Sequence, residues 1–390
     1  MSTNIAAPPF QRTSLTWLCY AVLGWYAYLQ GAMNPIMPLL RRDLDLNYTL
    51  GSLHPSAFAL GMIVAGVFGD RLALRYGIRR VFWAGSAGMV VGASLLMVGA
   101  IAPLTIFGTF LMGVLGTMAL VMIQTALVRL HSAFGSVALT ESNVSASLTA
   151  SVVPILVGIF EGIGWGWRWA IVVGIAVWVL IFVSQRSQQF PSSTPTAESK
   201  HEGSLPLLYW LYVLALFLGV CVEWSTWIWA ADYFIVQAKV DAALAAGLVT
   251  FFTIGAVSGR ITMSRLLRYR RPHQLMPVLM VIVLVGFPIF WLGTSAPMNV
   301  FGLFLLGIGS GAFFPLALSA SVSAAGAAVN KGSARVTMAA GAAILVIPFI
   351  LGLLADNVGI QRAYLMLPML AVMALGVTLV ANRINGKQRL

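Results

Sequence analysis

An acidic side chain deep inside a long apolar segment could bind and release a proton, and this 390-residue sequence contains one. Glu223 lies 16 residues after Leu207, where the apolar segment begins, which corresponds to about 24 Å along a helix rising about 1.5 Å per residue. A carboxyl at that depth is held in a medium of low dielectric constant, which favours its neutral form. Glu223 is therefore the first candidate for proton coupling. The alternative is a glutamate that only hydrogen-bonds a neighbouring helix.

A second acidic candidate lies near the start of another apolar segment, in Thr140-Glu141-Ser142-Asn143. Glu141 could take part in proton coupling. It could equally be a carboxylate at a helix start, where the helix dipole favours negative charge.

The histidines point to no other chemistry. None of them shares a predicted helix face with another histidine or a carboxylate, so we expect neither a metal site nor a cofactor; they are His54, His131, His201 and His273. A Ser-His-Asp arrangement and a phosphate-binding loop are also missing, so we expect no enzyme.

The composition places these side chains in a membrane protein. Hydrophobic residues make up 59% of the sequence and charged residues 9%, whereas a soluble domain usually has about 25% charged residues. The mean hydropathy is +0.91. The net charge of +12 does not indicate nucleic-acid binding, because the basic residues recur in short clusters between the apolar segments.

The apolar segments must be helices, since lipid offers the backbone no hydrogen-bond partners. We predict an all-α membrane protein with twelve transmembrane helices near residues 15–40, 50–74, 79–101, 103–128, 137–162, 167–185, 206–231, 243–266, 274–295, 297–323, 333–355 and 361–383. On alternate sides of these helices the Lys and Arg residues number 18 and 5, with the N-terminus on the richer side. This imbalance predicts that both termini are cytoplasmic, in the inner (plasma) membrane of the cell.

An internal repeat divides the chain at its centre. At an offset of 194 residues, Phe110-Leu111-Met112-Gly113 matches Phe304-Leu305-Leu306-Gly307, and the set Pro154, Gly158, Arg168 matches Pro348, Gly352, Arg362. A polar segment rich in Ser and Pro lies between the repeats and predicts a flexible cytoplasmic linker. We therefore predict two pseudo-symmetric six-helix bundles, residues 1–186 and 206–390, joined by linker 187–205. Such repeats place a transporter's substrate site at mid-membrane, between the bundles.

With these features, the sequence resembles the major facilitator superfamily. The family's signature loop between its second and third helices reads Gly-x-x-x-Asp-Arg-x-Gly-x-Arg-Arg, and Arg75-Tyr76-Gly77-Ile78-Arg79-Arg80 matches its second half. Leu74 replaces the Asp of the pattern, and Asp70 stands in place of its first Gly. The resemblance implies a cytoplasmic gate formed by Asp70, Arg71, Arg75, Gly77, Arg79 and Arg80. The segment Val153–Gly158 faintly resembles the family's antiporter motif and weakly favours export.

The resemblance also implies a cavity lined by the first, fourth, seventh and tenth helices. Its expected lining residues are Tyr28, Gln30, Asn34, Gln124, Trp224, Trp227 and Phe313. For the two tryptophans the alternative is an aromatic belt at the membrane surface. We expect no Lys or Arg deep in any helix, which argues against strongly anionic substrates. One acid among aromatic and amide groups suits neutral or cationic organic solutes.

We therefore expect a proton-coupled secondary transporter of a small neutral or cationic organic solute. It would work as a monomer in membrane lipid by alternating access, with a weak preference for export. The alternative is a lipid or amphiphile flippase, or a uniporter, of the same fold without proton coupling. A flippase would need an apolar groove open to the lipid. The sequence does not identify the solute.

Overall fold

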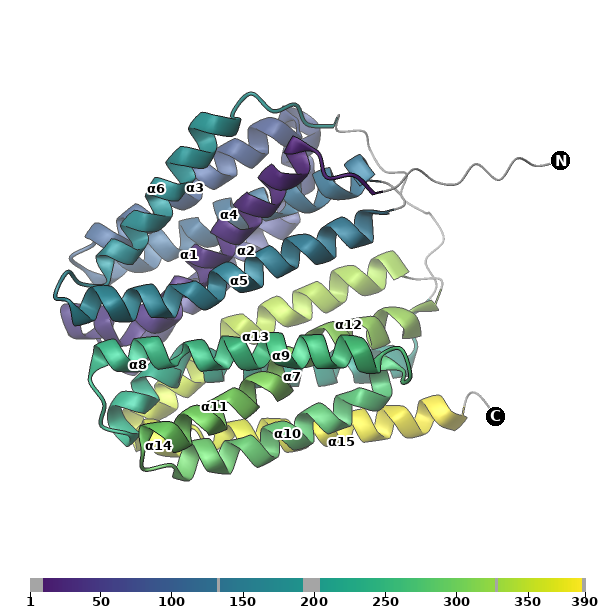
Figure 1. Ribbon diagram of the computed structural model, residues 1–390. Coiled ribbons are helices and arrows are strands. Elements are labelled where there is room, and N and C mark those ends of the chain that lie inside the picture. Colours follow the sequence, from purple (N-terminus) through teal and green to yellow (C-terminus); the bar gives the residue numbers. More distant parts are fainter. Residues whose placement is uncertain (1–9, 132–133, 192–203, 327–328, 388–390) are drawn as a thin grey trace.

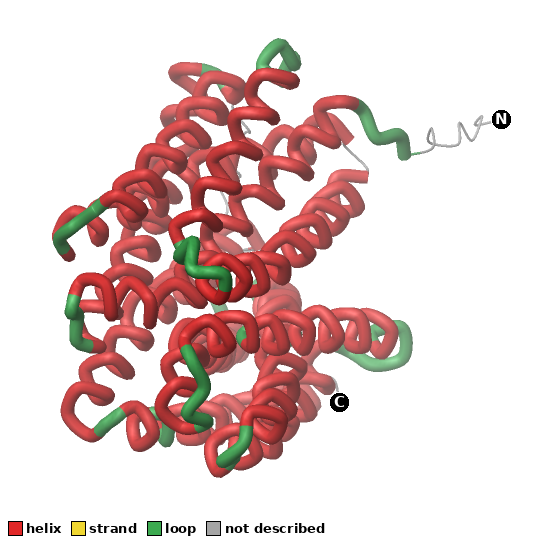
Figure 2. The backbone as a smooth tube through the Cα atoms, turned by 60° about the vertical axis from the view of Figure 1, so that its left-hand side comes forward, coloured by secondary structure: helices red, strands yellow, loops and turns green. Residues whose placement is uncertain are grey.

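The computed structural model describes residues 10–131, 134–191, 204–326 and 329–387, and this part of the chain is helical without strands (Figure 2). The predicted all-α membrane fold is confirmed. Eleven segments of the described chain are helices long and apolar enough to cross a membrane. A further helix, α1 (Ser14–Leu44), has 31 residues, so its length of about 46 Å also exceeds a hydrocarbon core of about 30 Å.

The helices of the first half of the chain are α1, α2 (Tyr48–Tyr76), α3 (Ile78–Val98), α4 (Ala102–His131), α5 (Gly135–Gly162) and α6 (Arg168–Gln185). Those of the second half are α7 (Leu207–Gln237), α8 (Ala242–Leu248), α9 (Thr250–Leu266), α10 (Pro272–Leu292), α11 (Ala296–Gly311), α12 (Phe313–Ala324), α13 (Val329–Val358), α14 (Ile360–Ala363) and α15 (Met366–Lys387). Three membrane-crossing segments are built from two helices each, namely α8 with α9, α11 with α12, and α14 with α15.

The buried side chains form two cores, one for each half of the chain. The first core takes its residues from α1 to α6 and adds Ala246. The second takes its residues from α7 to α15 and adds Met37 and Ala59. We call these groups of helices the N half and the C half. Figure 1 shows the N half above the C half, with the start of α1 and the end of α15 on the same side. We call that side the terminal side and the other the opposite side.

The internal repeat of the sequence is a repeat of close helix crossings. A Cβ atom at Gly61 of α2 would lie 2.6 Å from the carbonyl oxygen of Phe110 on α4, closer than a side chain allows. At the same offset of 194 residues, a Cβ atom at Gly255 of α9 would collide with the carbonyl oxygen of Phe304 on α11. The same correspondence holds for Gly113 against Phe58 and Gly307 against Phe252, and for Gly92 against Gly108 and Gly286 against Gly302. Glycine at these positions lets the helix backbones touch inside each half.

Two further glycines let the halves touch each other near the opposite side. A Cβ atom at Gly158 of α5 would lie 2.8 Å from the carbonyl oxygen of Ala243 on α8. A Cβ atom at Gly352 of α13 would lie 2.8 Å from the carbonyl oxygen of Tyr48 on α2. Gly158 and Gly352 are repeat partners, so the two crossings between the halves are related by the same pseudo-symmetry.

Candidate functional site

A glutamate and an arginine meet between the two halves. Nη2 of Arg260, on α9, lies 3.7 Å from Oε1 of Glu223, on α7. The same guanidinium donates from Nε to the carbonyl oxygen of Gly311 at 2.9 Å and from Nη1 to Oγ of Ser147 at 3.2 Å. Ser147 belongs to α5 of the N half, whereas Arg260, Glu223 and Gly311 belong to the C half. The Arg260 side chain therefore bridges the halves.

This pair lies in the middle of the membrane. Glu223 is 16 residues from the start of α7 and 14 from its end, and Ser147 is 12 residues from the start of α5 and 15 from its end. The expectation that no Lys or Arg lies deep in the membrane is wrong. Arg260 is only six residues from the end of α9 at Leu266, which made it look like a surface charge, but its long side chain extends inward to Glu223.

The break between α11 and α12 provides one of the arginine's acceptors. Pro315 has no backbone N–H, so it cannot make the helical hydrogen bond to the carbonyl of Gly311, four residues earlier. The helix ends at Gly311 and a new one begins at Phe313. The freed carbonyl accepts from Nε of Arg260, which satisfies both groups inside the membrane.

The two side chains of the pair differ in exposure. The Arg260 side chain is 43% exposed although it contacts α5, α7 and the α11–α12 break, whereas that of Glu223 is 12% exposed. Part of the Arg260 side chain is therefore left uncovered by the helices that it contacts.

Unpaired donors lie one turn further toward the opposite side. Trp227 follows Glu223 by four residues on α7 and stacks on Phe252 of α9, with ring centroids 6.4 Å apart. Its ring lies 3.7 Å from the position of a Cβ atom at Gly31 of α1. Trp227 Nε1 and Nδ2 of the buried Asn34 are both buried without a hydrogen-bond partner. Asn34 and Trp227 thus stay candidates for binding a ligand that carries acceptors.

Other predicted cavity residues lie elsewhere. The Tyr28 hydroxyl donates to the carbonyl oxygen of Ala170 on α6 at 2.7 Å, inside the N half. Phe313 is fully buried inside the C half, against Gly219 of α7. Each ring therefore contacts its own half in this structure, and the place of these two residues in the cavity stays a prediction. Of the rest, Gln124 is exposed on α4, while Gln30 and Trp224 are partly buried.

Glu141 binds groups near the terminal side of the N half. Its carboxylate accepts from Nε and Nη2 of Arg12 at 2.8 and 2.5 Å and from the Tyr20 hydroxyl at 2.9 Å. It lies beyond the first turn of α5, so it is not a carboxylate at a helix start. These bonds tie Arg12, the start of α1 and α5 together within one half. Glu141 is therefore a weaker coupling candidate than Glu223.

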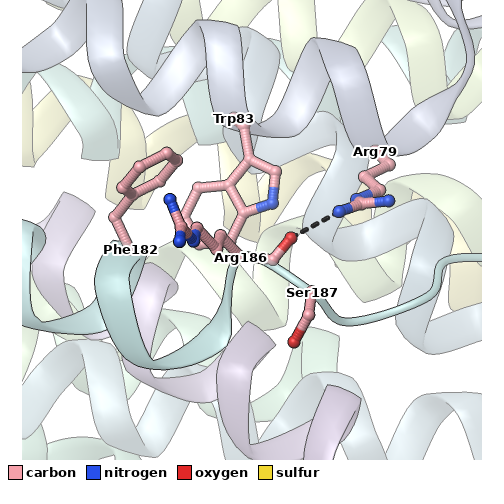
Figure 3. Close-up of a pocket in the computed structure, with 5 residues that line it drawn as sticks. All are labelled: Arg79, Trp83, Phe182, Arg186 and Ser187. Atoms are coloured by element: carbon pink, nitrogen blue, oxygen red, sulfur yellow. Dashed lines mark hydrogen bonds between the residues drawn. The ribbon is translucent and has the colours of Figure 1, made fainter.

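The residues of the predicted cytoplasmic gate lie on the terminal side. Gly77 makes the sharp turn from α2 to α3 with φ of 85°, which suits glycine. Arg79 donates to the carbonyl oxygen of Arg186 at 2.5 Å, beside a hollow lined also by Trp83, Phe182 and Ser187 (Figure 3). Arg71, Arg75 and Arg80 are exposed, whereas the side chain of Asp70 lies outside the described part of the chain. The bond of Arg79 stays within the N half, and the role of this loop as a latch stays a prediction.

A buried ion pair fastens the halves on the opposite side. Arg41 of α1 pairs with Asp232 of α7, with side chains 14% and 5% exposed. The Arg41 guanidinium also lies over the ring of Tyr48, 3.5 Å from its centroid. Sequence reasoning missed this pair because each residue lies one position beyond a predicted membrane segment. The signal available was a charge of each sign at those two segment ends.

Asp356 of α13 adds a second fastening at the start of α2. Its carboxylate accepts from the backbone N–H groups of Tyr48 and Thr49, each at 2.8 Å, and from the Thr49 hydroxyl at 2.5 Å. These N–H groups have no partner within their own helix, so a carboxylate is favoured there. Deeper along the same crossing, the Ser56 hydroxyl donates to the carbonyl oxygen of Leu345 at 2.7 Å. Polar contacts thus hold the halves together from the opposite side toward mid-membrane.

Comparisons with known proteins agree with this architecture. A family model described as Major Facilitator Superfamily matches residues 16–334. A bacterial homologue of the human lysosomal transporter Spinster, inward-facing and unoccupied, has a TM-score of 0.75 and 12% identity over 95% of this chain and 97% of its own. A variant of the nucleoside transporter NupG has a TM-score of 0.75 and 12% identity over 94% and 100%. The POT family transporter PepTSo has a TM-score of 0.72 and 12% identity over 98% and 99%. A search of curated proteins found no match.

Asp232→Asn should open the opposite side. It would leave Arg41 buried without its counter-charge, and losing one partner of a buried ion pair costs about 3–5 kcal/mol. Spin labels at Leu50 and Val236, both exposed, should report a longer distance across that side in the variant.

The matched control is Arg42→Gln, which removes a pair between Arg42 and Glu161 inside the N half. It should leave the distance unchanged. If Asp232→Asn also leaves it unchanged, the ion pair does not hold the halves together.

Proposed function

The chain belongs to the Major Facilitator Superfamily, and from that premise we propose that it is a proton-coupled secondary transporter of a small organic solute. Family membership makes it an integral membrane transporter and not an enzyme. The observation that supports the proton coupling is the position of Glu223, a mid-membrane carboxyl within ion-pair distance of Arg260.

The bonds of Arg260 suggest how a proton on Glu223 would act on the two halves. With Glu223 ionised, the guanidinium is held between Glu223 and Gly311 of the C half and Ser147 of the N half. Protonation removes the negative charge, so Arg260 loses its counter-charge at mid-membrane, where an unpaired charge is costly. The arrangement that spans the halves is then less favourable than one in which they have moved. Proton binding therefore shifts the population between the two facing states.

The structure removes the basis of two expectations, namely the charge of the solute and the direction of transport. The argument against anionic solutes rested on the absence of a deep cation, and Arg260 removes that basis. The weak preference for export rested on Val153–Gly158, but the close crossing of α5 with α8 is sufficient reason for glycine at position 158. We therefore propose neither a neutral or cationic solute nor a direction of transport.

We propose that the terminal side is cytoplasmic, because it carries most of the Lys and Arg residues. Tyr269 is 82% exposed in the loop that follows α9 on that side. A Tyr269→Cys variant should resist a membrane-impermeant maleimide in intact cells and react after permeabilisation. Asn47→Cys, exposed on the opposite side, should react in intact cells. The reverse pattern would overturn the orientation.

Glu223→Gln should remove the response of the conformation to pH, because glutamine resembles a glutamate that is always protonated. Spin labels at Leu74 and Tyr269, exposed on the terminal sides of the two halves, report how far that side is open. In the otherwise unchanged protein their distance distribution should differ between pH 8 and pH 5. The Glu223→Gln variant at pH 8 should already show the distribution of the unchanged protein at pH 5.

The control is Glu141→Gln, whose carboxylate binds Arg12 and Tyr20 near the terminal side. It should keep the normal pH response. A full pH response in Glu223→Gln would exclude Glu223 from coupling and favour a uniporter or flippase of the same fold.

A further inference from the structure

We propose that Arg260 binds the carboxylate of an aromatic organic acid, which competes with Glu223 for the guanidinium. This names the substrate class for the transport proposed above and rests on that function. The substrate acid and Glu223 are both carboxylates, and among the described residues Arg260 is the cation within ion-pair distance of Glu223.

The first argument is that Arg260 is incompletely bound. A guanidinium has five N–H donors, and the structure gives Arg260 two hydrogen bonds, to Gly311 and Ser147. The 3.7 Å between Nη2 and Oε1 of Glu223 is an ion-pair distance but too long for a hydrogen bond. The side chain is 43% exposed, so N–H donors of the guanidinium remain free to bind a ligand. Arginine binds planar oxyanions such as carboxylates through two parallel hydrogen bonds.

The second argument is the chemistry one helical turn away. Trp227 and Phe252 form a stacked aromatic pair next to the polar groups, which suits the apolar body of an aromatic acid. Buried donors without partners are rare in folded proteins, and Trp227 Nε1 is one. Nδ2 of Asn34, three residues after the Gly31 that Trp227 contacts, is another. Both could be satisfied by a ligand that carries acceptor atoms, whereas an organic ammonium group carries none.

The third argument is the balance of charge. Among the described residues, Arg260 is the charged side chain within ion-pair distance of Glu223, and Asp232, nine residues along α7, is paired with Arg41. The site is therefore neutral with Glu223 ionised and carries one positive charge with Glu223 protonated. When the carboxylate of the substrate binds the Arg260 guanidinium, Glu223 loses its ion-pair partner. Glu223 then binds a proton from water. One anion and one proton then occupy the site together and leave together, so the step moves no net charge.

Binding is tested on the purified full-length protein with two sets of probes of matched shape. The sets are phenylacetate, phenylacetamide and phenethylamine, and indole-3-acetate, indole-3-acetamide and tryptamine. Titration calorimetry in two buffers of different ionisation enthalpy gives both the affinity and the number of protons taken up. At pH 7 at least one acid should bind at least ten-fold more tightly than its amide or amine. Its binding should be accompanied by the uptake of about one proton.

Variants separate the roles of the two side chains. Arg260→Gln should weaken binding of the acid at least ten-fold, and Arg260→Lys should keep part of it because the charge remains. Glu223→Gln should bind the acid at least as tightly as the unchanged protein but without proton uptake. Arg265, an exposed arginine five residues further along α9, provides the matched control, and Arg265→Gln should change neither quantity.

The proposal is overturned if an amide or amine binds as well as its acid, or if no probe binds. It is also overturned if Arg260→Gln and Arg260→Lys keep full affinity for the acid, provided that size-exclusion chromatography shows both variants to be folded. Binding of an acid without proton uptake would overturn the competition with Glu223. None of these results alters the pH response of the spin-labelled protein without ligand, which tests the proposed function separately.

Discussion

The position of one ion pair, Glu223 with Arg260, constrains the rest of the molecule. Placing charges in the middle of a membrane is unfavourable, and a buried pair is tolerated only when its remaining donors and acceptors are also satisfied. Here two such partners of Arg260 are Ser147 of α5, in the other half, and the carbonyl of Gly311 at the helix break beside Pro315. The pair depends on the relative position of the halves, which makes it a place where protonation and conformation can be coupled.

The halves must be rigid for such a pair to respond as a unit, and glycine gives them that rigidity. Equivalent glycines at an offset of 194 residues bring helix backbones into contact inside each half, for example Gly61 on Phe110 and Gly255 on Phe304. The contacts between the halves are of another kind. They include ion pairs and hydrogen bonds, such as Arg41 with Asp232 and Asp356 with the start of α2. Polar contacts of this kind can be exchanged for water when the opposite side opens, which backbone contacts buried in each core cannot.

Much of the fold could be predicted from the sequence, because hydropathy and the repeat are properties of the chain itself. Glu223 could be found for the same reason, since an acid at the centre of an apolar segment is visible by position alone. Arg260 could not, because its Cα lies near a helix end and only the fold shows where its side chain reaches. Arg41 and Asp232 lay one residue outside the predicted segments, and their burial depends on each other. The contacts of Tyr28 and Phe313 inside their own halves could not be predicted either, because an apolar helix gives no sign of which face meets the other half.

The central claim is that Glu223 gains and loses a proton in the middle of the membrane. Infrared difference spectroscopy between pH 8 and pH 5 on the purified protein measures this most directly, because a protonated carboxyl has a C=O stretching band that an ionised one lacks. The account predicts a band that appears on acidification, is missing in Glu223→Gln, and persists in Glu141→Gln and Asp232→Asn. An unchanged difference spectrum in Glu223→Gln would contradict it.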